Sequence, residues 1–451
     1  MKTIPTKRAS RCLLSKRQRQ LRALLTALFL LTQSVMAQTT FHGNNARTGV
    51  YDSVGPKVFN GVQWSFKTEG PIISSPAIAN GTVFSGSSDG GFYAIDQSTG
   101  HQRWKVMFTD PISSSPAIAN GIVYFITYDG IFYALAADTG DIKWRFVTGG
   151  ERRFEAKGIH GLTPSNQNIA DPMDLFLSSP AVVNHRVYFG SSDGHLYALD
   201  AETGVLLWSF ETGDIVHASP AVANDTVYIG SWDSYFYALD AATGREKWRF
   251  KSGDDPVYQN QVGFQSSPAV SNGVVYVGCR DGHVYAIDAN TGKKNWDYST
   301  SQSWVNGTPA VRDGVVYVGT SDTFRFHALD AKTGRLIFAF DAHSLIFGSA
   351  AIAGDLAYFG AFNGRLYAVD ARSGKLAWEF QTDSSRKAPS NMLSPDGVFD
   401  KTAMAPMFHN FLDMTLNLSR MFSVGAILSS PVVDQGTIYF GSADGSLYAI
   451  H

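Results

Sequence analysis

The sequence predicts an all-β fold, an eight-bladed β-propeller of four-stranded antiparallel blades. The 451-residue chain repeats one pattern at intervals of roughly 40 residues, and periods of about 20–50 residues indicate repeat architectures such as propellers. Each copy carries turn residues spaced for four short strands, and the two chain ends hold complementary parts of one copy. A hydrophobic content of 44% and an aromatic content of 13% supply a buried core and exclude a disordered chain.

Each copy opens with a tripeptide of small residues that ends in proline, followed by an apolar stretch. Seven copies are marked by this proline: Pro76, Pro116, Pro180, Pro220, Pro268, Pro309 and Pro431. Ala350 takes the same position in the remaining copy. The count of copies predicts eight blades.

Turn chemistry divides each copy into four strands. In the fourth copy we expect strands at 221–223, 227–230, 235–239 and 245–250. Pairs such as Asn80-Gly81 favour the positive φ of two-residue hairpin turns. An Asp such as Asp89 recurs before the next reversal, and we interpret these residues as turn formers rather than metal ligands, because each belongs to a different blade.

One large aromatic residue recurs in the fourth strand. It is Phe338 in one copy and tryptophan in seven: Trp64, Trp104, Trp144, Trp208, Trp248, Trp296 and Trp378. A flat ring at the same point of every repeat packs most simply against the neighbouring repeat. We therefore expect these rings between adjacent blades.

The chain ends predict how the array closes. The last copy stops at His451 after its third strand, whereas 64–70 matches the fourth strand at 208–213 and has no three strands before it. Pairing of these two ends closes the ring and removes the unpaired edges of an open array. An open solenoid is the alternative.

Residues 1–37 have the composition of a secretory signal peptide. They carry eight Lys and Arg and no acid, an apolar run at 23–31, and small residues at Val35 and Ala37. We expect cleavage before Gln38 and export to the periplasm or the medium, which leaves residues 38–451 as a propeller that does not span the membrane. A single membrane anchor is the alternative, although the apolar run is shorter than a bilayer requires.

The expected mature domain is acidic and has one thiol. It holds 29 Lys and Arg against 39 Asp and Glu, a net charge of about −10, so we expect no nucleic acid as partner. Cys12 leaves with the signal, and Cys279 then has no partner for a disulfide or a Cys-rich metal site. We expect a monomer.

The frame Ala-x-Asp-x-x-Thr-Gly-x-x-x-Trp at 198–208 and 238–248 resembles the PQQ-repeat (pyrroloquinoline quinone) propeller superfamily. The resemblance covers nearly the whole mature chain and implies two functional branches. One comprises quinoprotein dehydrogenases, which hold PQQ and Ca²⁺ on the propeller axis; the other comprises cofactor-free, BamB-like propellers. The adjacent cysteines of the alcohol dehydrogenases and a Cys-x-x-Cys-His haem motif are absent from this sequence, and so is the Cys of a lipoprotein cleavage site.

Three connections between copies are longer than the others. They place insertions between the outermost strand of one blade and the innermost strand of the next, at 150–177, 254–265 and 383–424. Because all three occupy the same kind of connection, we expect them on one face above the channel. Long loops on one face of a rigid scaffold commonly carry binding function.

The insertions supply candidate ligand-binding residues. The first is dense in charge and contributes Glu151, Arg152, Arg153, Glu155 and His160. This set suits an anionic ligand, and the alternative is a salt-bridged loop that packs on itself. The second contributes hydrogen-bonding side chains at Tyr258, Gln259 and Asn260.

The third insertion is rich in Met and aromatic residues and includes the candidate His409. Packing of a small subdomain, with 408–421 helical, is one interpretation. A soft apolar surface for a partner or an apolar ligand is the other, because Met-rich surfaces adapt to varied shapes.

Residues just before each innermost strand should ring the channel mouth: Ile73, Ser113, Leu177, His217, Gln265, Asn306, Phe347 and Leu428. Among them His217, Gln265 and Asn306 are candidates for ligand binding, and Trp304 offers a stacking face. No cluster of carboxylates accompanies them in the sequence, so it predicts no Ca²⁺ site.

Two functional hypotheses remain. The first is an exported binding or scaffold propeller that recognises a protein partner or a small ligand on the insertion face. The alternative is a PQQ-dependent, quinoprotein-like dehydrogenase with PQQ and Ca²⁺ on the axis. The fold cannot decide between them, no catalytic residue can be named, and no Gly-x-Ser-x-Gly or His-Glu-x-x-His motif supports a hydrolase.

Overall fold

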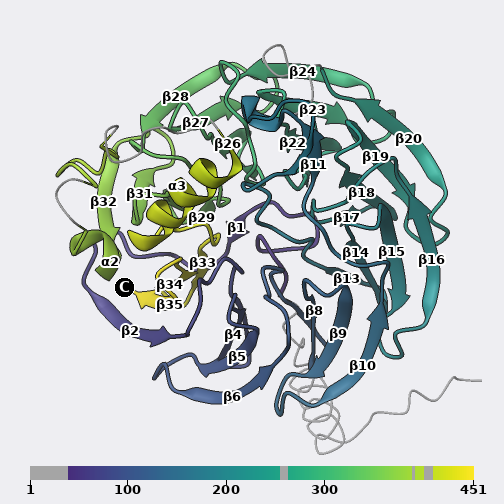
Figure 1. The fold of residues 1–451 in the computed structure, drawn as a ribbon, viewed down its shortest axis with the longest axis horizontal. Helices are drawn as coiled ribbons and strands as arrows, with labels where there is room; N and C mark the ends of the chain where they lie inside the picture. Colours follow the sequence, from purple (N-terminus) through teal and green to yellow (C-terminus); the bar gives the residue numbers. More distant parts are fainter. Residues whose placement is uncertain (1–38, 254–262, 389–391, 401–409) are drawn as a thin grey trace, which may run out of the picture. The chain divides into compact units, whose positions relative to one another are not determined.

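The computed structural model describes residues 39–253, 263–388, 392–400 and 410–451. The chain divides into two units, 1–37 and 38–451, and the second is a ring of antiparallel sheets around an axis (Figure 1). This confirms the predicted all-β, eight-bladed propeller. None of the helices in the described part of the chain has the length and hydropathy needed to cross a membrane.

The first four blades follow one another along the chain. Their strands are β3 (Ala77–Ala79), β4 (Thr82–Gly86), β5 (Gly91–Asp96) and β6 (Gln102–Met107); β7 (Ala117–Ala119), β8 (Ile122–Ile126), β9 (Ile131–Ala136) and β10 (Ile142–Val147); β13 (Ala181–Val183), β14 (Arg186–Gly190), β15 (His195–Asp200) and β16 (Leu206–Glu211); and β17 (Ala221–Ala223), β18 (Thr226–Gly230), β19 (Tyr235–Asp240) and β20 (Glu246–Lys251). The fourth blade matches the four strands predicted for it to within about one residue at each end.

The other four blades complete the circle. Their strands are β21 (Ala269–Ser271), β22 (Val274–Gly278), β23 (His283–Asp288) and β24 (Lys294–Ser299); β25 (Ala310–Arg312), β26 (Val315–Gly319), β27 (Arg325–Asp330) and β28 (Leu336–Asp341); β29 (Ala351–Ala353), β30 (Leu356–Gly360), β31 (Arg365–Asp370) and β32 (Leu376–Gln381); and β33 (Val432–Asp434), β34 (Thr437–Gly441), β35 (Ser446–Ile450) and β2 (Val62–Lys67).

The last blade closes the ring with strands from both ends of the chain. β2 pairs antiparallel with β35, with Trp64 opposite Ala449 and Phe66 opposite Leu447. The N-terminal strand therefore supplies the fourth strand that the last copy lacks. This confirms the predicted closure and excludes the open solenoid.

The recurring tryptophans join neighbouring blades, as predicted. The indole N–H of Trp144 donates to the Ala201 carbonyl in the next blade at 3.1 Å, and the ring covers the Thr-Gly turn of that blade. Gly204 in this turn has φ +73°, and a Cβ there would lie 2.6 Å from the indole. Only glycine satisfies both conditions, the left-handed backbone and the close approach.

The turn aspartates also act as predicted. Asp193 accepts hydrogen bonds from the His195 N–H at 3.0 Å and from the Tyr197 hydroxyl at 2.6 Å. It also accepts a hydrogen bond at 2.7 Å from the N–H of Gly149, which ends the preceding blade. The repeated Asp thus fixes a turn and ties two blades together.

A ring of serines surrounds the axis at the start of the innermost strands. The N–H of one blade donates to the serine hydroxyl of the next at 2.8–3.0 Å, as in Ser75 to Ser115 and Ser430 to Ser75. Five further links of this kind join Ser115 to Ser179, Ser179 to Ser219, Ser219 to Ser267, Thr308 to Ser349 and Ser349 to Ser430. The small residue before proline in each copy is therefore an inter-blade hydrogen-bonding residue.

Residues 39–51, here called the N-terminal segment, run across the inner strands. Carbonyls of this segment accept N–H groups from the second blade and from the fourth to the seventh, at Ile118, Val222, Val270, Val311 and Ile352. β1 (Val50–Tyr51) ends the segment and pairs parallel with β29. These contacts give five of the eight innermost strands a partner on their axis side and link blades that are distant in sequence.

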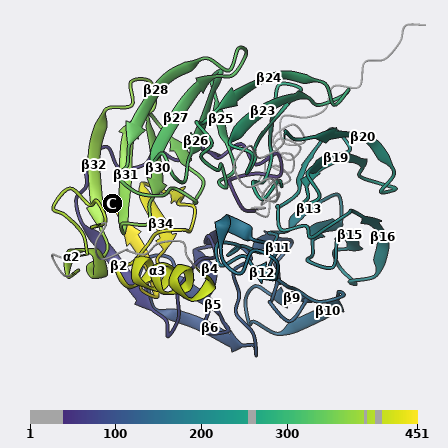
Figure 2. The ribbon, with the colours of Figure 1, turned by 45° about the horizontal axis from the view of Figure 1, so that its top comes forward.

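The first and third insertions carry the remaining elements. These are β11 (Glu155–Lys157), η1 (Ile159–Gly161) and β12 (Asn168–Ala170) in the first, and α2 (Asp383–Arg386) and α3 (Phe411–Ser423) in the third. Comparison of Figures 1 and 2 places α3, β11 and β12 on the face of the ring opposite the N-terminal segment.

Candidate functional site

Residues 151–177 and α3, here called the cap, pack together at the channel mouth. One apolar cluster joins Ile159 and Leu175 of the first insertion, Met414 and Leu418 of α3, and Phe347 at the mouth. Burial of this apolar surface holds the two insertions and the inner ends of the blades as one body. For the described residues, this supports the packed-subdomain interpretation of the third insertion and shows that the first insertion packs against it.

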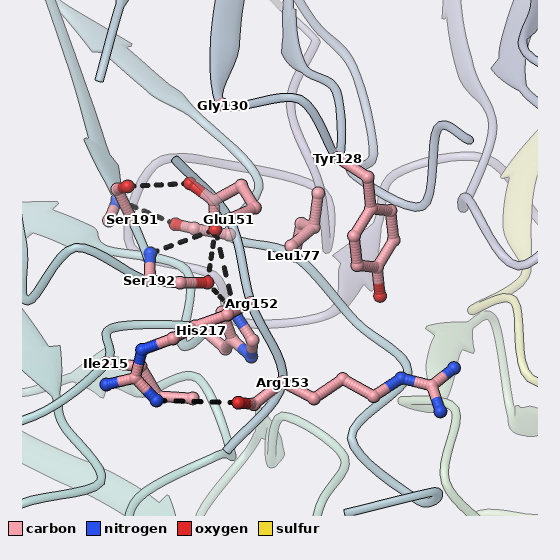
Figure 3. Close-up of polar contacts among 12 residues, drawn as sticks. Tyr128, Gly130, Glu151, Arg152, Arg153, Leu177, Ser191, Ser192, Ile215 and His217 are labelled. Atoms are coloured by element: carbon pink, nitrogen blue, oxygen red, sulfur yellow. Dashed lines mark hydrogen bonds and ion pairs between the residues drawn. The ribbon is translucent and has the colours of Figure 1, made fainter. Parts of the chain in front are cut away.

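Glu151 anchors the start of the cap below its surface. Its carboxylate accepts hydrogen bonds from the Ser191 hydroxyl at 2.6 Å, the Ser192 N–H at 2.9 Å and the Ser192 hydroxyl at 2.5 Å. Figure 3 shows this carboxylate between the two serines, with His217 beside Ser192. These donors satisfy the oxygens of a side chain that is only 1% exposed, as a buried polar group requires.

His217 connects Glu151 to a second buried carboxylate. Its Nδ1 lies 2.8 Å from Asp174 Oδ1, its Nε2 lies 2.5 Å from Ser192 Oγ, and Nε2 is 3.7 Å from Glu151. Burial alone would lower the pKa of His217, but the carboxylates of Asp174 and Glu151 outweigh it and raise that pKa to about 9. At neutral pH the imidazolium therefore holds two segments of the cap to the third and fourth blades.

Ser192, His217 and Asp174 have the spacing of a nucleophile, base and acid triad. The serine of such a triad must reach a substrate, and its hydroxyl must be free to lose a proton to the histidine. Ser192 is 1% exposed, its hydroxyl binds Glu151, and His217 is held in its protonated form. The three residues thus form a buried polar contact and lack the exposure of a hydrolytic site.

Arg280 forms the centre of the other half of the buried network. Its Cζ lies 4.3 Å from the ring centroids of both Trp232 and Trp304. Its Nη1 donates to Asp171 Oδ2 at 2.5 Å and its Nε donates to Gln265 Oε1 at 3.0 Å. Stacking on indole rings and a charge-assisted hydrogen bond together fix this fully buried cation.

Asp171 joins Arg280 to His160 within the cap. The His160 Nε2 lies 2.7 Å from Asp171 Oδ1, and the imidazole packs against Trp304 with ring centroids 4.8 Å apart. Burial opposes ionisation of Asp171, but the charges of Arg280 and His160 lower the pKa of this carboxyl well below its ordinary value. The carboxylate is therefore charged across the physiological range.

The network corrects one expectation from the sequence. Carboxylates do accompany the mouth residues, because the first insertion brings Asp171 and Asp174 beneath the cap, where Asp174 contacts both His217 and the Gln265 amide at 3.3 Å. Each carboxylate already has its own partners. No group of three or more His, Cys, Asp or Glu able to hold a metal occurs in the described ranges.

Other candidates of the first insertion lie apart from this network. Arg152 pairs with Asp214 at 3.2 Å on the surface, and Glu155 is exposed. Arg153 is half-buried, and its side chain extends away from Glu151 in Figure 3. The predicted cluster of charges thus divides into a buried part, at Glu151 and His160, and a surface part.

Four candidates lie outside the described residues. They are Tyr258, Gln259 and Asn260 of the second insertion and His409 of the third. Their roles stay predictions.

An axial chamber lies between the cap and the N-terminal segment. Its volume is about 40 Å³, and its lining contains seven of the eight residues predicted to ring the mouth: Ser113, Leu177, His217, Gln265, Asn306, Phe347 and Leu428. The serine ring lines its wall and Phe41 of the N-terminal segment also contacts it. Within the described residues, side chains thus close the channel from both ends and leave this small polar space on the axis.

PQQ with Ca²⁺ does not fit these residues. Sites for molecules of cofactor size have volumes of roughly 300–1,000 Å³, far above that of the axial chamber. Two indole rings of the mouth, Trp232 and Trp304, already contact Arg280. The carboxylates that would bind Ca²⁺ are hydrogen-bonded to Arg280, His160 and His217.

Sequence reasoning missed Arg280, Trp232 and Ser192, although one signal marks them. Each stands immediately before the turn Asp of its copy, and the same position holds Tyr128 and Phe362 in other copies. Variation at one position of an otherwise regular repeat identifies the side chains that meet at the mouth. Asp171 and Asp174 belong to no repeat, so the pattern carried no signal for their contacts.

Comparison with known proteins agrees with the fold. A family model described as outer membrane protein assembly factor BamB matches residues 60–159, 153–303 and 237–396. BamB from Moraxella catarrhalis is 17% identical with a TM-score of 0.61, over 87% of this chain and 97% of that chain. No curated protein matches the chain.

Two enzymes are also similar in structure. A europium-containing methanol dehydrogenase is 15% identical with a TM-score of 0.65, over 94% of this chain and 100% of that chain. The quinohemoprotein alcohol dehydrogenase from Comamonas testosteroni has the same identity and TM-score, over 94% of this chain and 82% of that chain. At these identities the similarity shows the fold alone.

Proposed function

Because the chain belongs to the family described as outer membrane protein assembly factor BamB, we propose that it is an exported scaffold propeller that binds a protein partner through its cap. The proposal extends the family description to this chain. It requires an apolar surface on the cap that the fold itself does not use.

The observation that carries the proposal is that α3 is apolar on two sides. Met414, Leu418 and Met421 are buried against the cap core. Leu412 and Leu416, one helical turn apart, remain 64% and 47% exposed on the same helix. A helix that needs only to cover the channel has no use for this second apolar stripe, and such exposed stripes commonly mark protein interfaces.

A pocket beside α3 adds to this surface. It has a volume of about 110 Å³ and is lined by Met173, Trp304, Phe324, Leu345, Met414 and Met421, among others. The lining is mainly apolar and includes three flexible thioethers, which adapt to the shape of an inserted side chain. This favours a protein partner that places an apolar side chain beside the helix.

Export rests on the leader sequence at 1–37. We propose cleavage before Gln38. The remaining propeller is acidic and has one thiol, Cys279, so its fold does not depend on a disulfide in the compartment to which it is exported. Sequencing the N-terminus of protein recovered from the periplasm or medium tests this. A mature chain that begins near Gln38 is expected, and an intact Met1 in the cytoplasm would contradict it.

Photocrosslinking in cells tests the cap surface directly. A photoreactive phenylalanine analogue at Leu412 should give a discrete adduct with one partner. The same analogue at Leu206, which is 46% exposed on the outer strand β16, is a control that matches the 47% exposure of Leu416, and it should give none. Equal adducts from both positions, or none from Leu412 and Leu416, would contradict a partner-binding cap.

The dehydrogenase alternative receives less support. The enzymes named above share the fold, but the mouth residues of this chain do not fit PQQ with Ca²⁺. We therefore do not propose a redox reaction for the axis.

A further inference from the structure

The axial chamber has hydrogen-bond donors without acceptors. Seven serine hydroxyls of the inner ring line it, and each accepts a backbone N–H from the preceding blade. None of these hydroxyls donates to a protein acceptor within the described residues. Their hydrogens are therefore available to a guest at the axis.

Asn306 is a second, independent sign of a guest. It is 7% exposed and lines the chamber, yet neither its Nδ2 nor its Oδ1 has a hydrogen-bond partner in the protein. A buried amide left without partners costs about 1–3 kcal/mol. Native proteins rarely keep such a group unless water or a bound ligand satisfies it.

One uncompensated cation near the chamber favours an anion. No Asp or Glu lines the chamber within the described part of the chain, and the charge of its one titratable lining residue, His217, is balanced by the buried carboxylates of Asp174 and Glu151. The uncompensated cation is Arg47 of the N-terminal segment, which is fully buried. Its guanidinium donates only to backbone carbonyls, those of Phe41, Ser179, Pro180 and Pro220.

Arg47 has no carboxylate partner among the described residues. Burial lowers its pKa to about 9, so it stays charged at neutral pH. Its Nη2 binds the carbonyl of Ser179, and its Cζ lies 5.2 Å from the ring of Phe41. Both of those residues line the chamber, and a buried cation bound only by neutral groups gains from a nearby anion.

The volume sets the size of the guest. About 40 Å³ exceeds the roughly 10–15 Å³ that one water needs and is far below that of an organic ligand site. From the donors, the charge and the size together, we propose that the axial chamber binds a single small inorganic anion of the halide class, represented by chloride.

Bromide locates the site directly. Crystals of the mature protein grown in sodium bromide should show an anomalous peak on the axis, within hydrogen-bonding distance of Asn306 Nδ2. Only water in the chamber, with no anomalous signal, would overturn the proposal.

Thermal unfolding measures the binding in solution. Chloride is exchanged for gluconate at constant sodium and constant ionic strength, so that only the small anion changes. We expect a saturable rise of Tm by about 2 °C or more with chloride. An unchanged Tm, or a shift that follows the cation when potassium replaces sodium, would overturn the proposal.

Two variants distinguish chloride binding in the chamber from a general effect of salt on Tm. Asn306→Leu should abolish the dependence on chloride. Ser344→Ala is the matched control, because Ser344 is fully buried and unpartnered but does not line the chamber, and it should keep the wild-type response. If Asn306→Leu still shows the rise of Tm with chloride, the axial chamber is not the binding site. If this variant fails to fold, the bromide peak in wild-type crystals still tests whether the chamber binds an anion.

Discussion

Single charged residues beneath the cap determine how stability depends on pH. His217 has an ordinary pKa of 6.5 when unfolded and about 9 when folded, so folding favours its protonated form. Asp174 and Glu151 are the titratable groups that contact it. The resulting stabilisation is complete below pH 6.5 and is lost as the pH rises through 9.

We therefore expect the free energy of unfolding to fall between pH 6.5 and 9 by about 3 kcal/mol. Urea unfolding at several pH values measures this decrease, and His217→Gln should remove most of it. The pKa of His283 is also raised, chiefly by Asp281, so His283 contributes to the same decrease in the free energy of unfolding. This contribution is present in both the wild type and His217→Gln and cancels when the two are compared. Equal slopes in both proteins would contradict the role of His217.

Buried and exposed ion pairs of the first insertion should differ in their effect on stability. Asp171→Asn leaves Arg280 without its counterion in a fully buried site and should lower the free energy of unfolding by about 3–5 kcal/mol. Asp214→Asn removes the exposed pair with Arg152 and should cost less than about 1 kcal/mol. Chemical denaturation of both variants checks this, and similar losses would contradict the network.

At the scale of strands, one blade interface lacks a hydrogen bond that the others have. In the second to fifth blades an indole N–H and a tyrosine hydroxyl share one carbonyl of the next blade, as Trp144 and Tyr124 share that of Ala201. Phe338 replaces the tryptophan in the sixth blade, so the Ala371 carbonyl accepts only from Tyr317. A hydrogen-bond donor added at position 338 should therefore stabilise the interface between the sixth and seventh blades.

Phe338→Trp should raise the free energy of unfolding by about 1 kcal/mol, because it supplies the missing donor to the Ala371 carbonyl. Trp296→Phe in the preceding blade removes the equivalent bond to Ala331 and should lower the stability by a similar amount. The urea midpoints of the two variants test the pair. Loss of stability in Phe338→Trp would show that Gly374, which packs against this ring, leaves no room for an indole.

The strands and turns could be predicted because the same turn and packing residues recur in each of the eight copies. Turn pairs, the Asp before each reversal and the inter-blade tryptophans all carry local requirements that a single copy reveals. The cap could not be predicted in this way. His160 lies only 11 residues from its partner Asp171, but His217 lies 43 residues from Asp174 and Arg280 lies 109 residues from Asp171, and nothing local in the insertion specifies these two distant partners.

At the scale of the whole molecule, the N-terminal segment covers one end of the channel and the cap covers the other. The N-terminal segment contacts the innermost strands on one side, and the cap covers the other with its own apolar cluster. The same rigid ring that could hold a cofactor on its axis instead holds Arg280, Asp171 and a chamber of about 40 Å³. The proposed binding function therefore lies outside the channel, on the exposed stripe of α3.

The most direct test of this account is to add PQQ with Ca²⁺ to the purified mature protein and to record quinone absorption and Tm. A mouth filled by its own side chains predicts no saturable, stoichiometric quinone spectrum and no rise in Tm. A stable one-to-one quinone complex with a raised Tm would contradict it and would show that the cap opens to admit a cofactor on the axis.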